Sequence, residues 1–402
     1  MHTTLKLRIP ASAPHLADGT VKGTYLLDLF SDMAAELLID IDGDEGVLKG
    51  VTGVELPEPV HLGDFIEADA EIVHWGDGMR QISFTAKKVA TSLKPALPRS
   101  SAGQRLPHAK VVCTAKSVHF VPEERRRIQN GPQPLIITAA PVGCETTRDD
   151  TPYLPITADE IAADVARCAV EGATVVHLHV RDAAGQPSQR RELFLDAISK
   201  IRQRCDIIVQ VSTEGEASMD VLERCQPLDT GADMATIATG TVNRGDHIFF
   251  NSKPLMEHVA LLVKQAKLQP CLEICDVGFL ENVKLLAKKG LIKLPGHFEF
   301  VLGARGGMGA RKDVLGLLEN NIPRGSTWSV AGVGRHQLTM AELAVRRGGH
   351  ARVGLEDNIH LGKGVQSQGS APLVAKVAEY SRSIGRPVAD VAAARTLLGI
   401  KQ

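Results

Sequence analysis

The sequence lacks a strong net charge, and this limits the partners that the protein can bind. Across 402 residues, 46 Lys and Arg side chains stand against 47 Asp and Glu side chains, so the formal net charge is −1 at pH 7. No overall basic field exists that would hold a nucleic acid or an anionic membrane surface. Anionic small molecules must therefore be bound by local positive groups.

Long apolar runs and paired cysteines are also missing. The first residues, MHTTLKLRIP, lack the apolar stretch of a signal peptide, and no segment approaches the length of a membrane-spanning helix. The seven cysteines show no C-x-x-C spacing, and an odd number does not suit a disulfide framework. We expect a reduced, cytoplasmic protein without a membrane segment.

Length and composition together favour two domains. A chain of 402 residues with 44% apolar residues can bury a large core, and this length suits two domains better than one. The composition changes at a charged segment, EERRRIQNGPQP, which leads into Gly and Pro. We expect a first domain at 1–122, a linker at 123–133 and a second domain at 134–402. The Pro- and Ser-rich stretch at 91–110 is interpreted as a long hairpin excursion, because the alternating pattern at 111–121 predicts a further strand of the first domain.

The second domain contains eight short apolar segments separated by helix-like stretches. This alternation is typical of parallel strands joined by crossover helices. Eight strands in about 270 residues match a (β/α)8 TIM barrel. An open doubly wound sheet, the alternative, needs a Gly-rich phosphate turn after its first strand, and PVGCETT does not supply one. The eight segments begin at Leu135, Val175, Ile207, Asp233, Cys271, His297, Ser326 and His350.

The first domain has a different pattern, in which one helix precedes several strands. An apolar helical pattern covers 24–41, and the segment DGDEG after it is interpreted as a turn. One long helix wrapped by an antiparallel sheet is an α+β arrangement that is typical of hot-dog folds. The alternating segments that predict strands are 50–56, 64–76, 79–89 and 111–121.

A candidate metal site comes from the second and last strands of the predicted barrel. Active sites of such barrels lie at the C-terminal ends of the strands. His177 and His179 share one face of an extended chain, because side chains alternate along a strand. Glu356 ends the last strand, which closes the barrel beside the first, so a His2–Glu set with one open position suits zinc as a Lewis acid. By itself, His-x-His is equally compatible with two histidines that only form hydrogen bonds inside a polar barrel.

Arg352 and Asp357 are further candidates beside Glu356. Arg352 lies four residues before Glu356 and shares its face, whereas Asp357 is expected to point the other way. We interpret the pair either as a cation that orients a second acid or base, or as a structural ion pair.

Four other polar residues lie in predicted strands or directly after them: Glu145 after the first, Ser212 at the end of the third, Thr236 in the fourth and Glu273 in the fifth. Glu145 and Glu273 would attract a cationic substrate group if they lie near a metal, and otherwise they are solvated loop acids. Ser212 and Thr236 would donate to a developing oxyanion, and the threonine alternatively only packs.

In the first domain, Asp32 and Glu36 lie four residues apart on the predicted helix and share a face. Paired carboxylates at this spacing are either a base with a modulating neighbour or the solvated face of an amphipathic helix. His15 is the third candidate in this domain.

Several segments of the second domain resemble the β-keto acid cleavage enzymes, from about residue 134 to residue 400. They include PLIITAAPVGCETTR, VVHLHVRDAAGQPSQR, MATIATGTVNRGDHIF, VAGVGRHQ and ARVGLEDN. The resemblance implies zinc on His177, His179 and Glu356, and a reaction in which a β-keto acid and the cosubstrate acetyl-CoA give acetoacetate and a new acyl-CoA. One position departs from the family, which commonly has Asn where this chain has Ala238, so a pocket-lining amide is missing there.

The resemblance also implies roles for the other candidates. Arg352 and Asp357 match the catalytic pair of the family, and Ser212 matches a hydroxyl near the reacting carboxylate. Members that act on 3-keto-5-aminohexanoate carry acids at the positions of Glu145 and Glu273, which would pair with the substrate ammonium.

The first domain resembles the hot-dog acyl-CoA ammonia-lyases in LKLRIP, LLDLFSDMAAELLIDIDGDEG, PEPVHLGDFIEADAEI and FTAKKV. This resemblance implies elimination of ammonia from 3-aminobutyryl-CoA to give crotonyl-CoA, with Glu36 or Asp32 as the base. It implies a homo-oligomer, a dimer or tetramer, because hot-dog sites form between subunits. Lys22 departs from the family, which often has an acid there.

Together, the two resemblances imply consecutive steps of lysine fermentation in one bifunctional chain. The alternatives are a barrel that cleaves another β-keto acid beside a thioesterase or hydratase, and a first domain that only dimerises and binds CoA.

Overall fold

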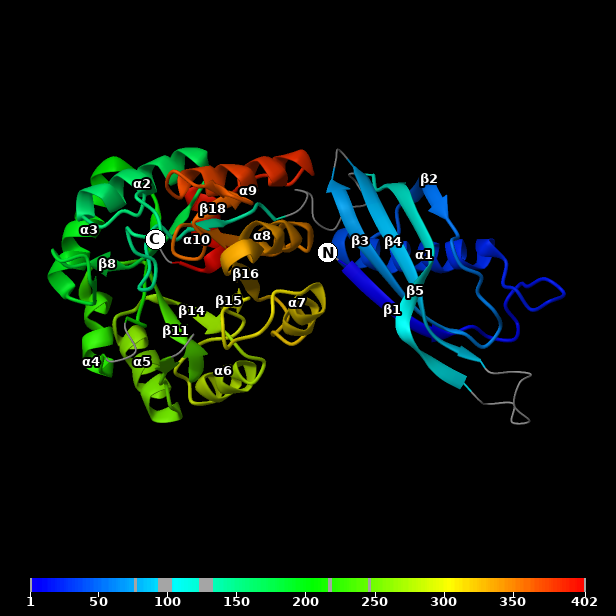
Figure 1. The fold of residues 1–402 in the computed structure, drawn as a ribbon, viewed down its shortest axis with the longest axis horizontal. Coiled ribbons are helices and arrows are strands. Elements are labelled where there is room, and N and C mark those ends of the chain that lie inside the picture. Colours follow the sequence, from blue (N-terminus) through cyan, green and yellow to red (C-terminus); the bar gives the residue numbers. More distant parts are fainter. Residues whose placement is uncertain are drawn as a thin grey trace. The chain divides into compact units, whose positions relative to one another are not determined.

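The computed structural model of this chain divides into two compact units, Met1–Gln133 and Pro134–Gln402 (Figure 1). It describes residues 2–75, 78–92, 103–122, 133–215, 219–244 and 247–400. Almost all of the expected linker at 123–133 lies outside the described residues. Within the described segments, no helix is long and apolar enough to cross a membrane. The seven cysteines all lie in described segments, and they are not joined by disulfides.

The first unit is a five-stranded antiparallel sheet with one long helix, which confirms the expected α+β hot-dog arrangement. The strands are ordered β1-β3-β4-β5-β2. Strands β1 and β2 follow each other in the sequence but lie at opposite edges of the sheet, because helix α1 connects them. The elements are β1 (His2–Arg8), α1 (Gly23–Asp42), β2 (Val47–Glu55), β3 (Phe65–Trp75), β4 (Met79–Ser92) and β5 (Gly103–Phe120).

Helix α1 is held against the sheet by an apolar stripe at helical spacing. Phe30, Met33 and Leu37 are among its buried residues, and Phe30 stacks on Phe84 of β4 with ring centroids 4.8 Å apart. The helix ends at Gly43, whose left-handed backbone lets its N–H bond the carbonyl of Ile39. DGDEG is therefore a turn, as the sequence predicts.

The prediction of a long hairpin excursion over residues 91–110 was wrong in its extent. Strand β4 continues to Ser92 and β5 begins at Gly103, and these two residues are paired in the ladder. At Thr91, Ser92, Gly103 and Gln104, backbone pairing thus outweighs poor strand propensity, and residues 93–102 lie outside the described residues. Strand β1, which the sequence analysis did not assign, pairs antiparallel with β3.

The second unit is a closed parallel barrel, and each of the eight expected segments forms one of its strands. The order around the barrel is β10-β11-β14-β15-β16-β17-β6-β7. The last strand pairs with the first through Arg352 and Thr138, as expected. The strands are β6 (Ile137–Ala139), β7 (Val175–Leu178), β10 (Ile208–Val211), β11 (Met234–Ala238), β14 (Gln269–Ile274), β15 (His297–Leu302), β16 (Thr327–Gly332) and β17 (His350–Val353).

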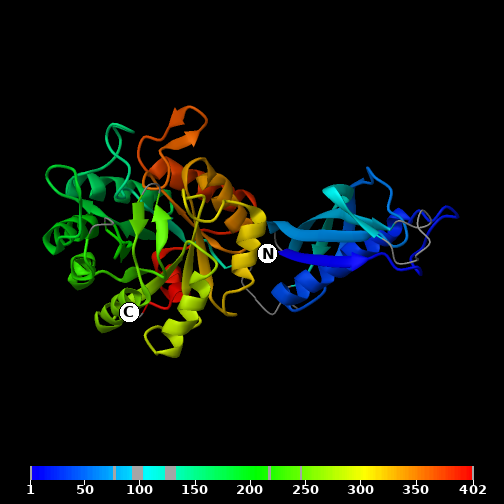
Figure 2. The same cartoon turned by 60° about the horizontal axis from the view of Figure 1, so that its bottom comes forward.

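Helices surround this barrel (Figure 2). Thr157 and Glu160 form a capping box at the start of α2. The helices are α2 (Ala158–Glu171), α3 (Arg191–Arg204), α4 (Val221–Arg224), α5 (Lys253–Gln265), α6 (Phe279–Lys288), α7 (Lys312–Glu319), α8 (Gln337–Arg346), α9 (Ala371–Ser383) and α10 (Val391–Leu398). Short two-stranded ribbons decorate the loops: β8 (Val180–Arg181) with β9 (Pro187–Ser188), β12 (Val242–Arg244) with β13 (His247–Phe249), and β18 (His360–Gly362) with β19 (Val365–Gln366).

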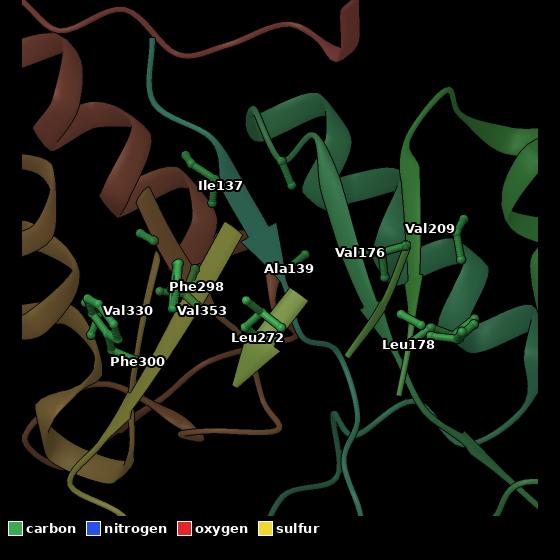
Figure 3. Packing of buried hydrophobic residues seen from close by; sticks show 14 of the residues in the cluster. Ile137, Ala139, Val176, Leu178, Val209, Leu272, Phe298, Phe300, Val330 and Val353 are labelled. Carbon is green, nitrogen blue, oxygen red and sulfur yellow. The ribbon is translucent and has the colours of Figure 1, made fainter. Parts of the chain in front are cut away.

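Side chains alternate along the barrel strands between an apolar outer face and an interior that combines polar residues with a small apolar cluster that includes Ile208 and Met234. On β7, Val176 and Leu178 belong to the apolar core cluster, together with Phe298 and Phe300 of β15 (Figure 3). The residue between each pair is polar and belongs to the barrel interior, as at Glu299. The strands therefore collect polar side chains inside the barrel.

His297 lies in this buried interior. Its Nδ1 is 2.9 Å from Thr327 Oγ1, and its Nε2 is 3.4 Å from Ser329 Oγ. Burial lowers the pKa of His297 to about 4. The imidazole is therefore neutral in the folded protein at pH 7.

This neutral histidine predicts a pH dependence of barrel stability. The unfolded chain binds a proton near the ordinary histidine pKa of 6.5, whereas folded His297 does so only near 4. Stability is therefore lost as the pH falls through this window, by about 3 kcal/mol in total. In His297→Gln, urea unfolding at pH 7 and pH 4.5 should show a smaller pH dependence than in the unaltered protein.

The matched control is His258→Gln on α5, because His258 is exposed. It should leave the pH dependence unchanged. Equal pH dependence in His297→Gln and the unaltered protein would contradict the assignment of His297 as a buried neutral group.

Candidate metal centre and active site

A cavity of about 540 Å³ opens at the C-terminal ends of the barrel strands. Loops that follow strands far apart in the sequence contribute its walls. The structure brings eight of the nine barrel candidates into its lining: Glu145, His177, His179, Ser212, Glu273, Arg352, Glu356 and Asp357.

The two histidines and Glu356 form a cluster that fits a metal ion. Nε2 of His177 and Nε2 of His179 each lie 3.6 Å from Oε1 of Glu356, and the three ligand atoms lie within 4.8 Å of one another. Ligand atoms about 2.1 Å from a tetrahedral ion lie about 3.4 Å apart, close to this spacing. The second carboxylate oxygen of Glu356 is buried and has no hydrogen-bond partner in the described part of the chain. An ion between the three side chains would satisfy it.

The Nδ1 atom of each histidine contacts a neighbouring side chain. Nδ1 of His177 donates a hydrogen bond to Oε1 of Gln210 at 2.7 Å, so Nε2 is the unprotonated nitrogen of the neutral ring, as metal binding requires. Nδ1 of His179 lies 3.6 Å from Sγ of Cys144. Neither partner was proposed from the sequence, although an amide inside the apolar segment IIVQVST was a signal that this position faces a polar interior.

Arg352 connects the candidate ligand Glu356 to two other acids. It donates through Nη2 to Glu356 at 2.6 Å, through Nη1 to Glu299 at 2.9 Å and through Nε to Asp357 at 3.0 Å. The expectation that Asp357 points away from this face was wrong. Strand β17 ends at Val353, and the turn that follows brings both acids to the same guanidinium.

Burial and mutual charge shift the pKa values of this group. Burial raises the pKa of Glu356 to about 8, and nearby Asp357 adds to the shift while Arg352 opposes it. Burial alone would lower the pKa of Arg352, but the surrounding carboxylates outweigh it and hold this pKa well above its ordinary value. One guanidinium thus serves several buried carboxylates, and a divalent cation would compensate the remaining negative charge.

Glu299 is a site residue that the sequence analysis missed. It is fully buried on β15, and its second oxygen accepts a hydrogen bond from Ser329 Oγ at 3.1 Å. Burial raises the pKa of Glu299, and the charge of Arg352 opposes this shift. The available signal was an acid at the centre of the apolar segment HFEFVL.

The remaining barrel candidates differ in their access to the cavity. Glu273 is buried in the wall, and its Oε2 lacks a hydrogen-bond partner among the described residues. Ser212 Oγ accepts the N–H of Glu214 at 3.2 Å, so its own proton can be donated into the cavity. Thr236 is not brought to the cavity: it is fully buried, and its hydroxyl oxygen accepts the N–H of Thr213 at 3.2 Å.

Ala238 does not line the cavity, and its carbonyl accepts a hydrogen bond from the Asn251 side chain at 2.6 Å. The cavity nevertheless contains an amide, because Asn243 lies in its lining. The amide that appeared to be missing at residue 238 is therefore available from another loop.

The three candidate site residues of the hot-dog unit do not form one cluster in the structure. Asp32, Glu36 and His15 are all exposed. Glu36 accepts a hydrogen bond from Thr3 Oγ1 at 3.0 Å, and His15 Nδ1 lies 2.7 Å from the carbonyl of Ala13. Lys22 is the residue that precedes α1.

A small pocket of about 30 Å³ in the hot-dog unit lies elsewhere, between α1 and the strands β2, β4 and β5. Its lining is mostly apolar but includes Ser117 and His119, whose Oγ and Nε2 lie 2.8 Å apart. Burial lowers the pKa of His119. The sequence analysis did not single out this pair.

With this geometry in place, comparison with known proteins identifies the barrel. Residues 134–400 match the family of the beta-keto acid cleavage enzyme. The chain belongs to this family. It is 41% identical over 270 residues to the 3-keto-5-aminohexanoate cleavage enzyme of Fusobacterium nucleatum subsp. nucleatum, which covers 67% of this chain and 98% of that relative.

Two relatives from Acetoanaerobium sticklandii together span both units. Its 3-keto-5-aminohexanoate cleavage enzyme is 39% identical over 270 residues, covering 67% of this chain and 99% of the relative. Its 3-aminobutyryl-CoA ammonia lyase is 39% identical over 131 residues, covering 32% of this chain and 99% of the relative. This β-keto acid cleavage enzyme therefore carries an additional ammonia-lyase-like unit.

If His177, His179 and Glu356 bind zinc, replacing either histidine should lower the zinc content of the protein. The unaltered cleavage enzyme should retain about one zinc ion per chain after dialysis. His177→Ala and His179→Ala should each lose most of it, because two ligands remain where three stood. Elemental analysis by mass spectrometry measures the content.

His336→Ala is the matched control, because His336 lines the same cavity outside the metal set. It should keep the metal. Full zinc content in both ligand variants, or no metal in the unaltered protein, would overturn the assignment.

Proposed function

We propose that the barrel unit converts 3-keto-5-aminohexanoate and acetyl-CoA to acetoacetate and 3-aminobutyryl-CoA. The observation that carries this proposal is that Glu145 and Glu273 line the same cavity as the candidate metal ligands and the Arg352–Asp357 pair. The cavity therefore offers carboxylates for an ammonium group beside groups suited to keto acid chemistry. The relatives named above act on this amino-bearing substrate, which supports the proposal.

The metal site has one chemical task in this proposal. His177, His179 and Glu356 would hold a zinc ion, which would supply a Lewis acid for the β-keto acid. Gln210 fixes the orientation of His177 by accepting a hydrogen bond from its Nδ1–H group.

The proton chemistry belongs to Asp357. Its carboxylate takes the proton from C2, the carbon between the keto group and the carboxylate of the substrate. Arg352 holds Asp357 by two hydrogen bonds, of 3.0 and 3.1 Å, and so fixes the position of the base. Ser212 donates a hydrogen bond from its hydroxyl group to the substrate carboxylate.

Bond making and breaking then balance without another reactant. C2 attacks the acetyl thioester carbonyl and releases CoA as a thiolate. This thiolate attacks the C3 carbonyl, and the bond between C2 and C3 breaks. The carbanion left at C2 takes back the proton held by Asp357, so acetoacetate leaves with the acetyl group and with C1 and C2 of the keto acid. The other four carbons become 3-aminobutyryl-CoA.

For the hot-dog unit, we propose elimination of ammonia from 3-aminobutyryl-CoA to give crotonyl-CoA. The proposed product of the barrel, 3-aminobutyryl-CoA, is the compound in the name of the hot-dog relative, a 3-aminobutyryl-CoA ammonia lyase. This supports consecutive reactions in one chain. The α-proton next to the thioester needs a base, and Asp32 or Glu36 on the exposed face of α1 is our candidate.

We propose a homo-oligomer as the active form, because the hot-dog candidates do not converge within one chain. Strand β2 is the edge of the sheet, and it exposes the apolar side chains of Val47, Leu48, Val51 and Val54. An edge strand with exposed apolar side chains is suited to pairing with a second copy.

One assay tests both reactions. Purified protein is incubated with zinc, acetyl-CoA and 3-keto-5-aminohexanoate, and the products are identified by mass spectrometry. We expect acetoacetate and crotonyl-CoA, with 3-aminobutyryl-CoA as a transient species. Free CoA would favour a thioesterase, accumulated 3-aminobutyryl-CoA would favour a hot-dog unit that only binds CoA, and no acetoacetate would refute cleavage of this keto acid.

Variants of the same protein separate the two units. Asp32→Asn with Glu36→Gln should stop the formation of crotonyl-CoA and leave acetoacetate formation unchanged. Undiminished crotonyl-CoA in this double variant would exclude both carboxylates as the base, and the Ser117–His119 pocket would be tested next.

Glu299 should act as a positioning residue for Arg352. Glu299→Gln removes the negative charge that holds Nη1 of Arg352 but preserves the size of the side chain. We expect kcat for cleavage to fall by roughly tenfold to a hundredfold, with zinc content unchanged. Steady-state kinetics and elemental analysis measure the two quantities.

The control is Glu319→Gln, which breaks an ion pair of 2.7 Å with Arg347 outside the cavity lining. It should lower thermal stability without lowering kcat. A normal kcat in Glu299→Gln would remove Glu299 from the catalytic group.

A further inference from the structure

Charge is distributed unevenly around the barrel cavity. Its acids lie at the ends of four strands: Glu145 after β6, Glu214 after β10, Glu273 in β14, and Glu356 and Asp357 after β17. Two arginines line the cavity from the neighbouring loops after β15 and β16: Arg305 and Arg335. Both arginines are exposed, so they belong to the mouth of the cavity.

Backbone contacts anchor the loop that carries Arg305. Gly303 has a φ of 88°, and its N–H donates to the carbonyl of Met308 at 2.8 Å. Gly306 has a φ of 93° and packs closely on Asn243, since a Cβ atom there would lie 2.6 Å from the Asn243 carbonyl oxygen. The N–H of Met308 donates to Cys275 at 3.3 Å. Glycine thus lets this loop follow the cavity wall.

The loop that carries Arg335 is anchored beside Asp357, the proposed base. Gly334, with a φ of 62°, donates its N–H to the carbonyl of Asp357 at 2.8 Å. The backbone of Arg335 is therefore held next to the proposed base, while its side chain extends to the exposed mouth.

Arg335 has no acidic partner in the segments that the structure describes. Its Nε lies 3.4 Å from Nε2 of His336, and no ion pair joins it to an Asp or Glu. Arg311, by contrast, forms two hydrogen bonds of 3.0 Å with Asp313. The positive charge of Arg335 is thus available to a ligand.

We propose that Arg305 and Arg335 form the subsite for the phosphate groups of the CoA cosubstrate. This inference rests on the proposed function, because it assumes an acyl-CoA reaction in this cavity. The acetyl thioester must reach the reacting groups, whereas the phosphates are highly charged and joined to it by a long pantetheine arm. They remain at the mouth, where guanidinium groups match phosphate oxygens well.

The same arrangement assigns an orientation to each substrate. The phosphates bind on the side of β15 and β16, and the ammonium of the keto acid binds at Glu145 and Glu273. The two charged ends therefore approach from different sides and do not compete for one wall.

The test compares two acetyl donors in the full-length zinc enzyme. Acetyl-CoA carries the phosphates, and acetyl-pantetheine has the same thioester without them. Arg305→Ala with Arg335→Ala should raise KM for acetyl-CoA by about tenfold. It should leave kcat and KM for acetyl-pantetheine unchanged. Added salt should raise KM for acetyl-CoA in the unaltered enzyme more than in the variant.

Arg324→Ala is the matched control, because Arg324 is exposed and precedes β16, whereas Arg335 follows it. It should change neither KM. An equal rise of KM for both donors, an unchanged KM for acetyl-CoA, or a rise only in KM for the keto acid would overturn the phosphate subsite. Failure of the unaltered enzyme with both donors would instead refute the proposed function.

Discussion

The buried ion-pair group around Arg352 is the constraint on which the barrel site depends. One guanidinium binds Glu299, Glu356 and Asp357 inside the barrel. Charges buried at this depth are tolerated only when they are paired and hydrogen bonded. Arg352 therefore fixes the candidate base Asp357 and directs Glu356 toward the two histidines. The excess of carboxylates leaves the cavity negatively charged, which is a physical reason for it to bind a divalent cation and an ammonium group.

The barrel makes this charged interior possible because its strands separate two environments. Residues such as Phe298 and Phe300 pack outward against the helices, and Glu299 between them faces inward. The apolar shell stabilises the fold, whereas the interior holds the chemical groups. A substitution inside the barrel should then affect chemistry more than folding, provided that it leaves no buried charge unpaired.

The two units contribute different chemistry to the proposed sequence of reactions. The barrel holds a compact group of acids, histidines and an arginine within one chain. In the hot-dog unit, Asp32 and Glu36 are exposed and have no common partner in the described segments. This difference explains why the barrel reaction can be argued residue by residue, and why we propose that a second copy of the chain completes the hot-dog site.

The sequence by itself determined the eight strands, the single hot-dog helix and the set of His177, His179 and Glu356. These follow from local periodicity, from the alternation of side chains and from the closure of a barrel. Only the tertiary structure decided that Asp357 turns back to Arg352, that Glu299 completes the group and that Thr236 is buried away from the cavity. Such contacts depend on the register between strands and on loop conformation, which bring residues 53 positions apart together. Local sequence patterns do not encode that register.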